Sequence, residues 1–427
     1  MKRLYYALLC AIMFMLSFHF SFSVHSESLD STTLYVGGSG PGNYSSIGLA
    51  IRDAHNGDTV FVYEGSYDGL VTINKQISVI GESKYGTVIY RGGSGDCVNI
   101  TTDNVRLQGF TVRNGGQGHD YPNDAGVEVH ADNAWIEDIA SLNVNYGIWV
   151  RDSDNATIIN CTLNNDYDCI WLFKAKDCFL RGNNMSGASI VIDGNVVEHV
   201  LHDIDTSNSV NGKPVYYYKN TGGVTVPSGA GQIIFANCSW CVVENQNIAH
   251  VTDGVEILFS RSITVKSNRF YDTVDFGVRL AFSSSCSIIN NEFDNNPIGI
   301  GLMSGGIWIE NMGGHCWGIL IRNNDIKNSW YQGVRMDHAY RTCMSKNNFE
   351  NNGWNSEGSG AHVYFLNSFE TEAFENYWDD WIGIRYPRLD CFPKVLKGQR
   401  NMFWLMPARK MLWFAIDRDP LSAPIER

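Results

Sequence analysis

A recurring pattern in the first half of the chain brings acidic, basic and aromatic side chains into register. Phrases of glycine, an apolar residue, any residue and an apolar residue start at Gly126 and Gly147, and variants start at Cys169 and Ser189. If each phrase is a strand, its apolar residues point inward and the residues between them point outward. The outward side chains predicted for this face are those of Glu128, His130, Trp149, Arg151, Trp171, Phe173 and Asp193.

These side chains suit the recognition of sugars. Exposed rings would stack on sugar rings, and the neighbouring acidic and basic groups would bind hydroxyls and carboxylates. We therefore predict a polysaccharide-binding face whose binding residues are Trp149, Trp171, Phe173 and His130. In the alternative interpretation, the aromatic rings lie under a loop, for which residues 117–124 are the candidate, and form a small second core.

The same face holds the candidates for catalysis. Hydrolysis of a glycosidic bond needs two carboxyl groups, usually about 5 to 9.5 Å apart, whereas β-elimination needs a base beside an acidic cluster that binds Ca²⁺. Glu128, Arg151 and Asp193 are the candidates here, and Arg279 and Arg335 occupy equivalent outward positions later in the chain. No motif decides between a lyase, a hydrolase and a protein without catalysis. Calcium is a possible cofactor, and none is firmly predicted.

One cluster has the composition of a metal site. His199, His202 and Asp203 follow Glu198 closely, and imidazole is a ligand that suits copper. Two histidines three residues apart could chelate from a helix or loop, but on a strand their rings face opposite sides. We favour a polar loop and keep copper binding as an alternative.

The spacing of the phrases predicts the fold. They lie 20 to 23 residues apart, both from Gly126 to Ser189 and from Gly254 to Gly299. Every element has a period of two, is short, and ends in Gly or Asn. A leucine-rich repeat of this length needs a fixed leucine ladder, which is absent. The pattern therefore predicts an all-β parallel β-helix of about eleven coils.

Stacked coils lie about 4.8 Å apart, so equivalent residues form columns. Asparagine at the turn is then expected to form a ladder of side-chain amides, at Asn160, Asn290, Asn291, Asn323 and Asn324. The same register predicts a buried column of inert thiols at Cys178, Cys241, Cys286 and Cys343. The pair Cys238 and Cys241 falls within a coil, which argues against a thioredoxin-like site.

The chain divides into four predicted segments. Residues 1–26 have the basic start and apolar run of a secretory leader, with an uncleaved anchor as the alternative. Residues 32–96 form an N-terminal cap and the first coils, including a short helix that Ser46 caps and that buries Ile47, Ala50 and Ile51. Residues 97–375 hold the repeats, with an irregular insertion at about 195–230, and residues 376–427 form a C-terminal cap.

Composition limits the possible partners. The formal net charge is −13 and 44% of the residues are hydrophobic, so the chain can bury a large core. An acidic surface argues against nucleic acid, which requires basic patches. After the leader, no later segment is predicted to span a membrane, and we expect a monomer.

Several stretches resemble a known family. Residues 211–218 (Asn-Gly-Lys-Pro-Val-Tyr-Tyr-Tyr), 231–238 (Gly-Gln-Ile-Ile-Phe-Ala-Asn-Cys) and 376–381 (Asn-Tyr-Trp-Asp-Asp-Trp) resemble NosD-like secreted proteins. This resemblance implies a right-handed β-helix of the carbohydrate-binding and sugar-hydrolase type, with a pectin-lyase-like fold. It also implies a periplasmic copper-handling accessory protein as one possible function.

Together these observations predict a secreted, periplasmic or cell-surface protein that binds, and in one version cleaves, extracellular polysaccharide. A non-catalytic surface or adhesion scaffold is the first alternative, and the copper-handling accessory protein is the second. An uncovered groove with acids, arginines and aromatics would favour the sugar-binding function. Convergent His and Met side chains would favour copper.

Overall fold

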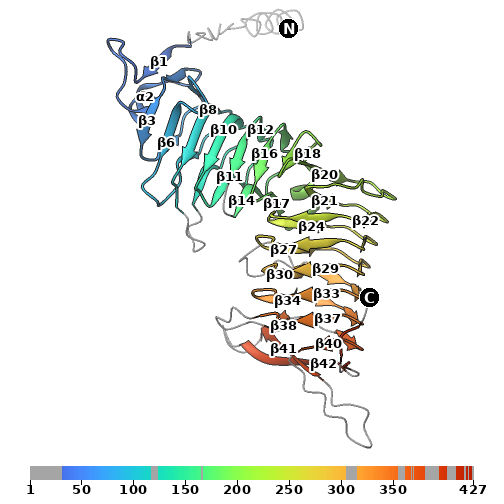
Figure 1. Cartoon of the computed structure of the whole chain (residues 1–427). Helices are drawn as coiled ribbons and strands as arrows, with labels where there is room; N and C mark the ends of the chain where they lie inside the picture. The colour runs from blue at the N-terminus through green and yellow to red at the C-terminus, as the bar shows by residue number, and fades with distance from the viewer. Residues whose placement is uncertain are drawn as a thin grey trace, which may run out of the picture.

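The protein is a right-handed parallel β-helix, as the sequence predicts, and its described residues include one short α-helix (Figure 1). The computed structural model describes residues 31–116, 124–164, 167–303, 315–353, 361–366, 368, 370–379, 394–401, 410–417, 420–421 and 423–425. The predicted leader lies outside the described residues. Consecutive coils pair in parallel and in register, so each coil rests on the one before it.

The N-terminal end is closed by the predicted helix. Helix α2 (Ile47–Asp53) lies between strands β1 (Thr33–Val36) and β2 (Thr59–Val62). The Ser46 side chain accepts a hydrogen bond from the backbone N–H of Leu49 at 3.3 Å, which caps the helix. Ile47, Ala50 and Ile51 are buried, as predicted. The helix therefore covers apolar surface that the first coil would otherwise expose.

The coils form two stacks. One sheet of the first stack runs in the order β4 (Val71–Ile73), β7 (Val98–Ile100), β9 (Ala125–Val129), β11 (Tyr146–Arg151), β14 (Asp168–Phe173) and β17 (Ile190–Asp193). The corresponding sheet of the second stack runs β21 (Gln232–Ala236), β24 (Asp253–Leu258), β27 (Phe276–Ala281), β30 (Ile298–Met303), β34 (Gln332–Asp337) and β38 (Ala361–Leu366).

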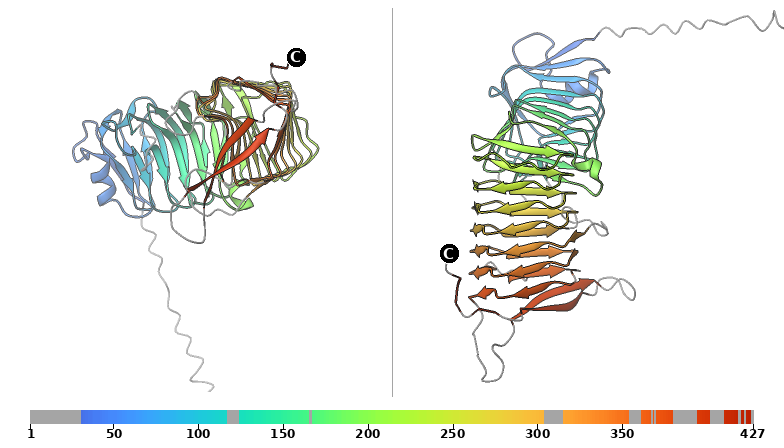
Figure 2. Two further views of the ribbon diagram at one scale, coloured as in Figure 1. Left: turned by 90° about the horizontal axis from the view of Figure 1, so that it is seen from below. Right: turned by 90° about the vertical axis from the view of Figure 1, so that its right-hand side faces the viewer.

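The stacks meet at an angle where the insertion was predicted (Figures 1 and 2). The chain leaves β17 through a short 3-10 helix, η1 (Val197–Val200), and two short strands, β18 (Asp203–Ile204) and β19 (Ser209–Val210). Strand β20 (Lys213–Lys219) pairs antiparallel with β19 and parallel with β21. It therefore ends one stack and starts the next. We call this junction the elbow.

The second stack contains the predicted asparagine ladder. Amide Nδ2 of each buried asparagine donates to Oδ1 of the next at 2.9 to 3.1 Å, in the order Asn268, Asn291, Asn324, Asn347 and Asn376. Asn290 and Asn323 lie outside the ladder, because they take the left-handed turn position just before it, and Asn160 takes such a position in the first stack; φ is 54° to 55° at all three. The buried amides form hydrogen bonds with backbone groups at turns that water cannot reach.

The ladder ends at the C-terminal cap. Strands β41 (Lys394–Asn401) and β42 (Lys410–Asp417) form an antiparallel hairpin against the last coils. A carboxylate oxygen of Asp417 accepts hydrogen bonds from the Asn376 amide and the Trp378 indole, both at 2.9 Å. The Asn-Tyr-Trp motif thus anchors the cap to the final coil.

The cysteine column is confirmed in part. Cys178, Cys241 and Cys286 are buried, and burial raises the pKa of Cys178 and Cys286 to about 12. Cys343 is half-buried and aligns with the outward residue Leu320, so its place in the column was wrong. Thr342 holds the inward position instead, because its neighbour Cys343 begins strand β36 (Cys343–Ser345).

Candidate functional site

The register of the predicted face is confirmed. Glu128 on β9 pairs with Trp149 on β11, and Trp149 pairs with Trp171 on β14. Arg151 is aligned with Phe173, and Phe173 with Asp193 on β17. The predicted residues therefore lie on one sheet of the first stack.

The exposure expected for the two tryptophans is wrong. Trp149 and Trp171 are only 5% and 4% exposed, and their rings stack at 4.8 Å with an interplanar angle of 7°. The Tyr146 ring packs 5.0 Å from that of Trp171. The structure thus supports the covered interpretation for these two rings. Residues 117–123, the loop suggested as their cover, lie outside the described residues.

Two predicted residues form an ion pair. Nε of Arg151 lies 2.7 Å from Oε1 of Glu128. The guanidinium of Arg151 also lies 4.9 Å from the Trp149 ring centroid, which is cation–π distance. The Glu128 side chain is 9% exposed and that of Arg151 is 30% exposed. Arg151 therefore places a positive charge between a buried carboxylate and the surface.

A second carboxyl group faces Glu128 from the preceding coil. Asp96, just before β7, is hydrogen-bonded to Glu128. The pKa of Asp96 is raised to about 7, chiefly by burial and also by the nearby charges of Glu128 and Asp124, whereas a hydrogen bond from the Ala125 N–H lowers it. Asp96 therefore keeps its proton to a much higher pH than an exposed aspartate does.

Backbone contacts hold this pair in place. Oδ1 of Asp96 accepts from the Ala125 N–H at 2.8 Å, and Oδ2 of Asp124 accepts from the Gly95 N–H at 3.0 Å. A Cβ at Gly116 would lie 1.5 Å from Oδ2 of Asp124, so only glycine leaves room for this carboxylate. Hydrogen bonds from backbone N–H groups to these carboxylates therefore join adjacent coils.

Asp96 was not predicted as a site residue, because the candidates were the outward residues within each phrase. The signal lies just before the phrases, where acids recur at Asp96, Asp124, Asp168, Asp253 and Asp275. Such a column of acids is costly to bury unless protons or cations neutralise it.

Asp193, the third candidate for catalysis, belongs to a different cluster at the elbow. Its Oδ1 lies 2.6 Å from Nη1 of Arg279 on β27 of the second stack. The same guanidinium lies 2.7 Å from carboxylate oxygens of both Asp253 and Glu256. All four side chains are 4% exposed or less. Arg279 and Asp193 are therefore fully engaged within the fold.

The elbow cluster seals the open edge of β17. Nη2 of Arg279 donates to the Ile192 carbonyl at 3.1 Å, and Nε2 of Gln232 donates to the Ile190 carbonyl at 2.6 Å. Side chains of the second stack thus replace the missing neighbouring strand. Burial raises the pKa of Asp253 and Glu256, while Arg279 lowers it. This network joins the stacks.

The other binding candidates are at the surface. His130 is exposed two residues beyond Glu128 on the same face. Phe173 is half-buried, with its ring centroid 5.5 Å from that of Trp171. These two side chains, unlike the tryptophans, remain accessible.

The predicted metal ligands are not brought together. His202 is buried, its Nδ1 accepts from the Cys178 N–H at 3.3 Å, and its Nε2 lies 3.1 Å from the His199 carbonyl oxygen. Burial lowers the pKa of His202 to about 3. Asp203 is exposed and pairs with Arg181. Within the described part of the chain, no group of three or more His, Cys, Asp and Glu side chains could hold a metal ion.

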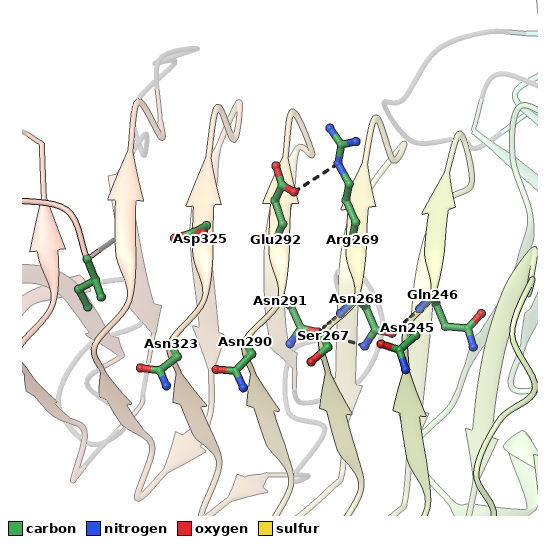
Figure 3. Close-up of a pocket in the computed structure, with 11 residues that line it drawn as sticks. Asn245, Gln246, Ser267, Asn268, Arg269, Asn290, Asn291, Glu292, Asn323 and Asp325 are labelled. Carbon is green, nitrogen blue, oxygen red and sulfur yellow. Dashed lines mark hydrogen bonds and ion pairs between the residues drawn. The ribbon is translucent and has the colours of Figure 1, made fainter. Parts of the chain in front are cut away.

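An open groove of about 790 Å³ follows the asparagine turns of the second stack (Figure 3). The left-handed residues Asn245, Ser267 and Asn290 line it, together with the Arg269–Glu292 ion pair of 3.4 Å. Its buried amides bond to one another and to the backbone. The groove is the outer side of the structural ladder, and we assign no ligand to it.

No helix in the described residues is long and apolar enough to cross a membrane.

Comparisons with known proteins agree with the fold. Residues 142–317 match the model of a right-handed β-helix region. Among solved structures, a PL6 alginate lyase in complex with a trisaccharide is 12% identical, with a TM-score of 0.38 over 81% of this chain and 85% of that one. The mannuronan C-5 epimerase A-module from Azotobacter vinelandii is 15% identical, with a TM-score of 0.35 over 77% and 95%. Pectin methylesterase from Erwinia chrysanthemi is 12% identical, with a TM-score of 0.34 over 69% and 88%.

These are distant similarities to pectin-lyase-like β-helix enzymes that act on polysaccharides. Among curated proteins, none matches the chain in sequence.

Proposed function

We propose that this protein is a secreted or cell-surface hydrolase that binds and cleaves extracellular polysaccharide with Asp96 and Glu128. The observation that carries the proposal is the contact of Asp96, whose pKa is about 7, with Glu128, which lies 2.7 Å from Arg151. A carboxyl group whose pKa is about 7 can donate a proton at neutral pH, which an ordinary aspartate cannot do.

The roles follow from the surroundings of each carboxyl group. Asp96, whose pKa is about 7, acts as the acid, and Glu128, which forms an ion pair with Arg151, acts as the base. Glu128 takes a proton from a water molecule, whose oxygen forms the new bond to the anomeric carbon. The glycosidic carbon–oxygen bond breaks, and the leaving oxygen receives the Asp96 proton.

The pair is closer than in the common glycosidases, whose carboxyl groups lie about 5 to 9.5 Å apart. Cleavage by this route requires the two groups to separate when a sugar binds, because the acid and the base act on opposite faces of the anomeric carbon. Exposed His130 on the same face can bind sugar hydroxyls. Trp149 acts indirectly, because its buried ring positions the Arg151 guanidinium.

The test is hydrolysis of a panel of neutral and acidic polysaccharides by the purified chain, followed by new reducing ends. We expect product from the wild type, a loss of at least about 100-fold in Asp96→Asn and Glu128→Gln, and no change in Asp68→Asn, which alters an exposed aspartate. Retention on a polysaccharide without product would reduce the proposal to binding. Unchanged activity in both variants, or a folded protein that neither binds nor cleaves any polymer, would contradict it and favour the scaffold function.

A further inference from the structure

A row of exposed aromatic and basic side chains follows one turn of the second stack, away from the Asp96–Glu128 pair. Successive coils place Ser239, Arg261, Ser284 and Trp317 in one column of parallel bridges, and Trp317 pairs with Tyr340 in the next coil. Trp240 directly follows Ser239 at the start of the row. We call these residues, with Arg341, the turn track.

The rings of the track form platforms. Trp317 is 44% exposed, and its ring lies 5.8 Å from that of Tyr340 with an interplanar angle of 25°. The Arg341 guanidinium lies 4.8 Å from the Trp317 ring centroid. His315 meets the Tyr340 ring edge-on at 4.8 Å. These contacts fix the Tyr340 and Trp317 planes before any ligand arrives.

Folding does not account for Trp240. The residue is 68% exposed, so it contributes little to the core. Its φ is 60°, in the left-handed region that disfavours bulky side chains. The equivalent positions in the next coils are Ser262, Ser285 and Gly318, which are small, and then Arg341, whose φ is 52°. A large exposed ring that contributes little to the core points to a binding role.

Charge identifies the class of ligand. Arg261 is exposed and makes no ion pair with any described residue, although the chain has a net charge of −13. Ser284 separates it from Trp317 in the column, which leaves space beside the ring. A free guanidinium between aromatic platforms suits a sugar that carries a carboxylate.

The length of the track fits a polymer. From Ser239 to Tyr340 the column crosses four coil steps, or roughly 19 Å at about 4.8 Å per step. We propose that the turn track binds an acidic, uronate-containing polysaccharide along the axis of the second stack, without catalysis. The inference does not depend on hydrolysis by Asp96 and Glu128.

The test is retention in affinity gels that contain alginate, polygalacturonate or neutral hydroxyethylcellulose. We expect retention by the two polyuronates only, weakened about tenfold or more in Trp240→Ala/Trp317→Ala and made less salt-sensitive in Arg261→Ala. Trp135→Ala is the matched control, because Trp135 is 41% exposed on the first stack and lies 5.8 Å from the Arg106 guanidinium. It should retain full binding, and all variants should keep the wild-type melting temperature.

Equal retention of the double variant and the wild type would overturn the inference. So would absence of retention by any polyuronate, which would favour a protein partner for this surface. Asp96→Asn separates the two proposals, because its hydrolysis should fall at least about 100-fold while its retention should still weaken when Trp240 and Trp317 are also replaced by Ala. Hydrolysis of short oligosaccharides should in turn survive in the double tryptophan variant.

Discussion

The Arg279→Met variant tests whether the elbow cluster joins the two stacks. Methionine keeps an apolar side chain of similar length but removes the charge that faces Asp193, Asp253 and Glu256 at 2.6 to 2.7 Å. Removing one partner of a buried ion pair costs about 3–5 kcal/mol. We expect the upper part of this range, because the variant also leaves the Ile192 carbonyl without its 3.1 Å donor.

The assay is urea unfolding at pH 7, with Arg269→Met as the matched control. Arg269 pairs with Glu292 at 3.4 Å, and its side chain is 50% exposed, so its loss should cost no more than about 1 kcal/mol. At pH 5 the cost of Arg279→Met should shrink, since the carboxyl groups left behind can take up protons. A loss below about 1 kcal/mol at pH 7, or an equal loss at both pH values, would refute this account of the elbow.

Three further predictions concern stability. In the wild type, the unfolding free energy should fall as the pH rises from 5 to 8. Buried Asp96, Asp253 and Glu256 have raised pKa values and therefore hold protons more tightly in the folded state. A flat pH profile in thermal unfolding would contradict this. Trp171→Ala should cost about 3–5 kcal/mol in urea unfolding, because it empties a covered site; an unchanged midpoint would restore the exposed interpretation. Asn291→Ala should lower the unfolding free energy by about 1–3 kcal/mol, because it breaks the ladder, whereas the neighbouring change Asn290→Gly should alter it by no more than about 0.5 kcal/mol. Equal costs would show that the ladder amides add no stability beyond that of the turn residues.

The sequence was sufficient to predict the coils, because each rests on its neighbour through contacts that repeat every 20 to 23 residues. The register that aligns Glu128, Trp149 and Trp171 follows from this period alone. The capping helix and the asparagine ladder were equally accessible, since both depend on local backbone requirements. The ion pair of Glu128 and Arg151 was not predicted, because the two residues lie in adjacent columns of this register.

The repeat pattern did not decide between exposed and covered tryptophans, because it does not show which side chains pack over their rings. The contacts at the elbow were not accessible either, because they join residues far apart in the sequence, such as Asp193 and Arg279, which are 86 positions apart. A repeat pattern does not determine the angle at which two stacks meet. Asp193 was therefore predicted to be a surface acid of the sugar-binding face, although its carboxylate forms a buried ion pair with Arg279.

Asp96 was missed for another reason. It lies outside the repeated phrase, and its pKa depends on burial and on Glu128 and Asp124 from the next coil. Only the three-dimensional stacking shows that these acids converge. Acids that recur just before each phrase are the signal to search for in comparable chains.

The pH dependence of hydrolysis tests the central claim most directly. The measurement is kcat/KM against pH, on the polysaccharide that the wild type cleaves, for the wild type and Asp124→Asn. We predict an alkaline limb near pH 7, where Asp96 loses its proton, and a shift of this limb to lower pH in Asp124→Asn, because the variant removes a charge that raises the Asp96 pKa. A limb that stays in place in Asp124→Asn, or persists in Asp96→Asn with activity intact, would contradict the assignment of Asp96 as the acid.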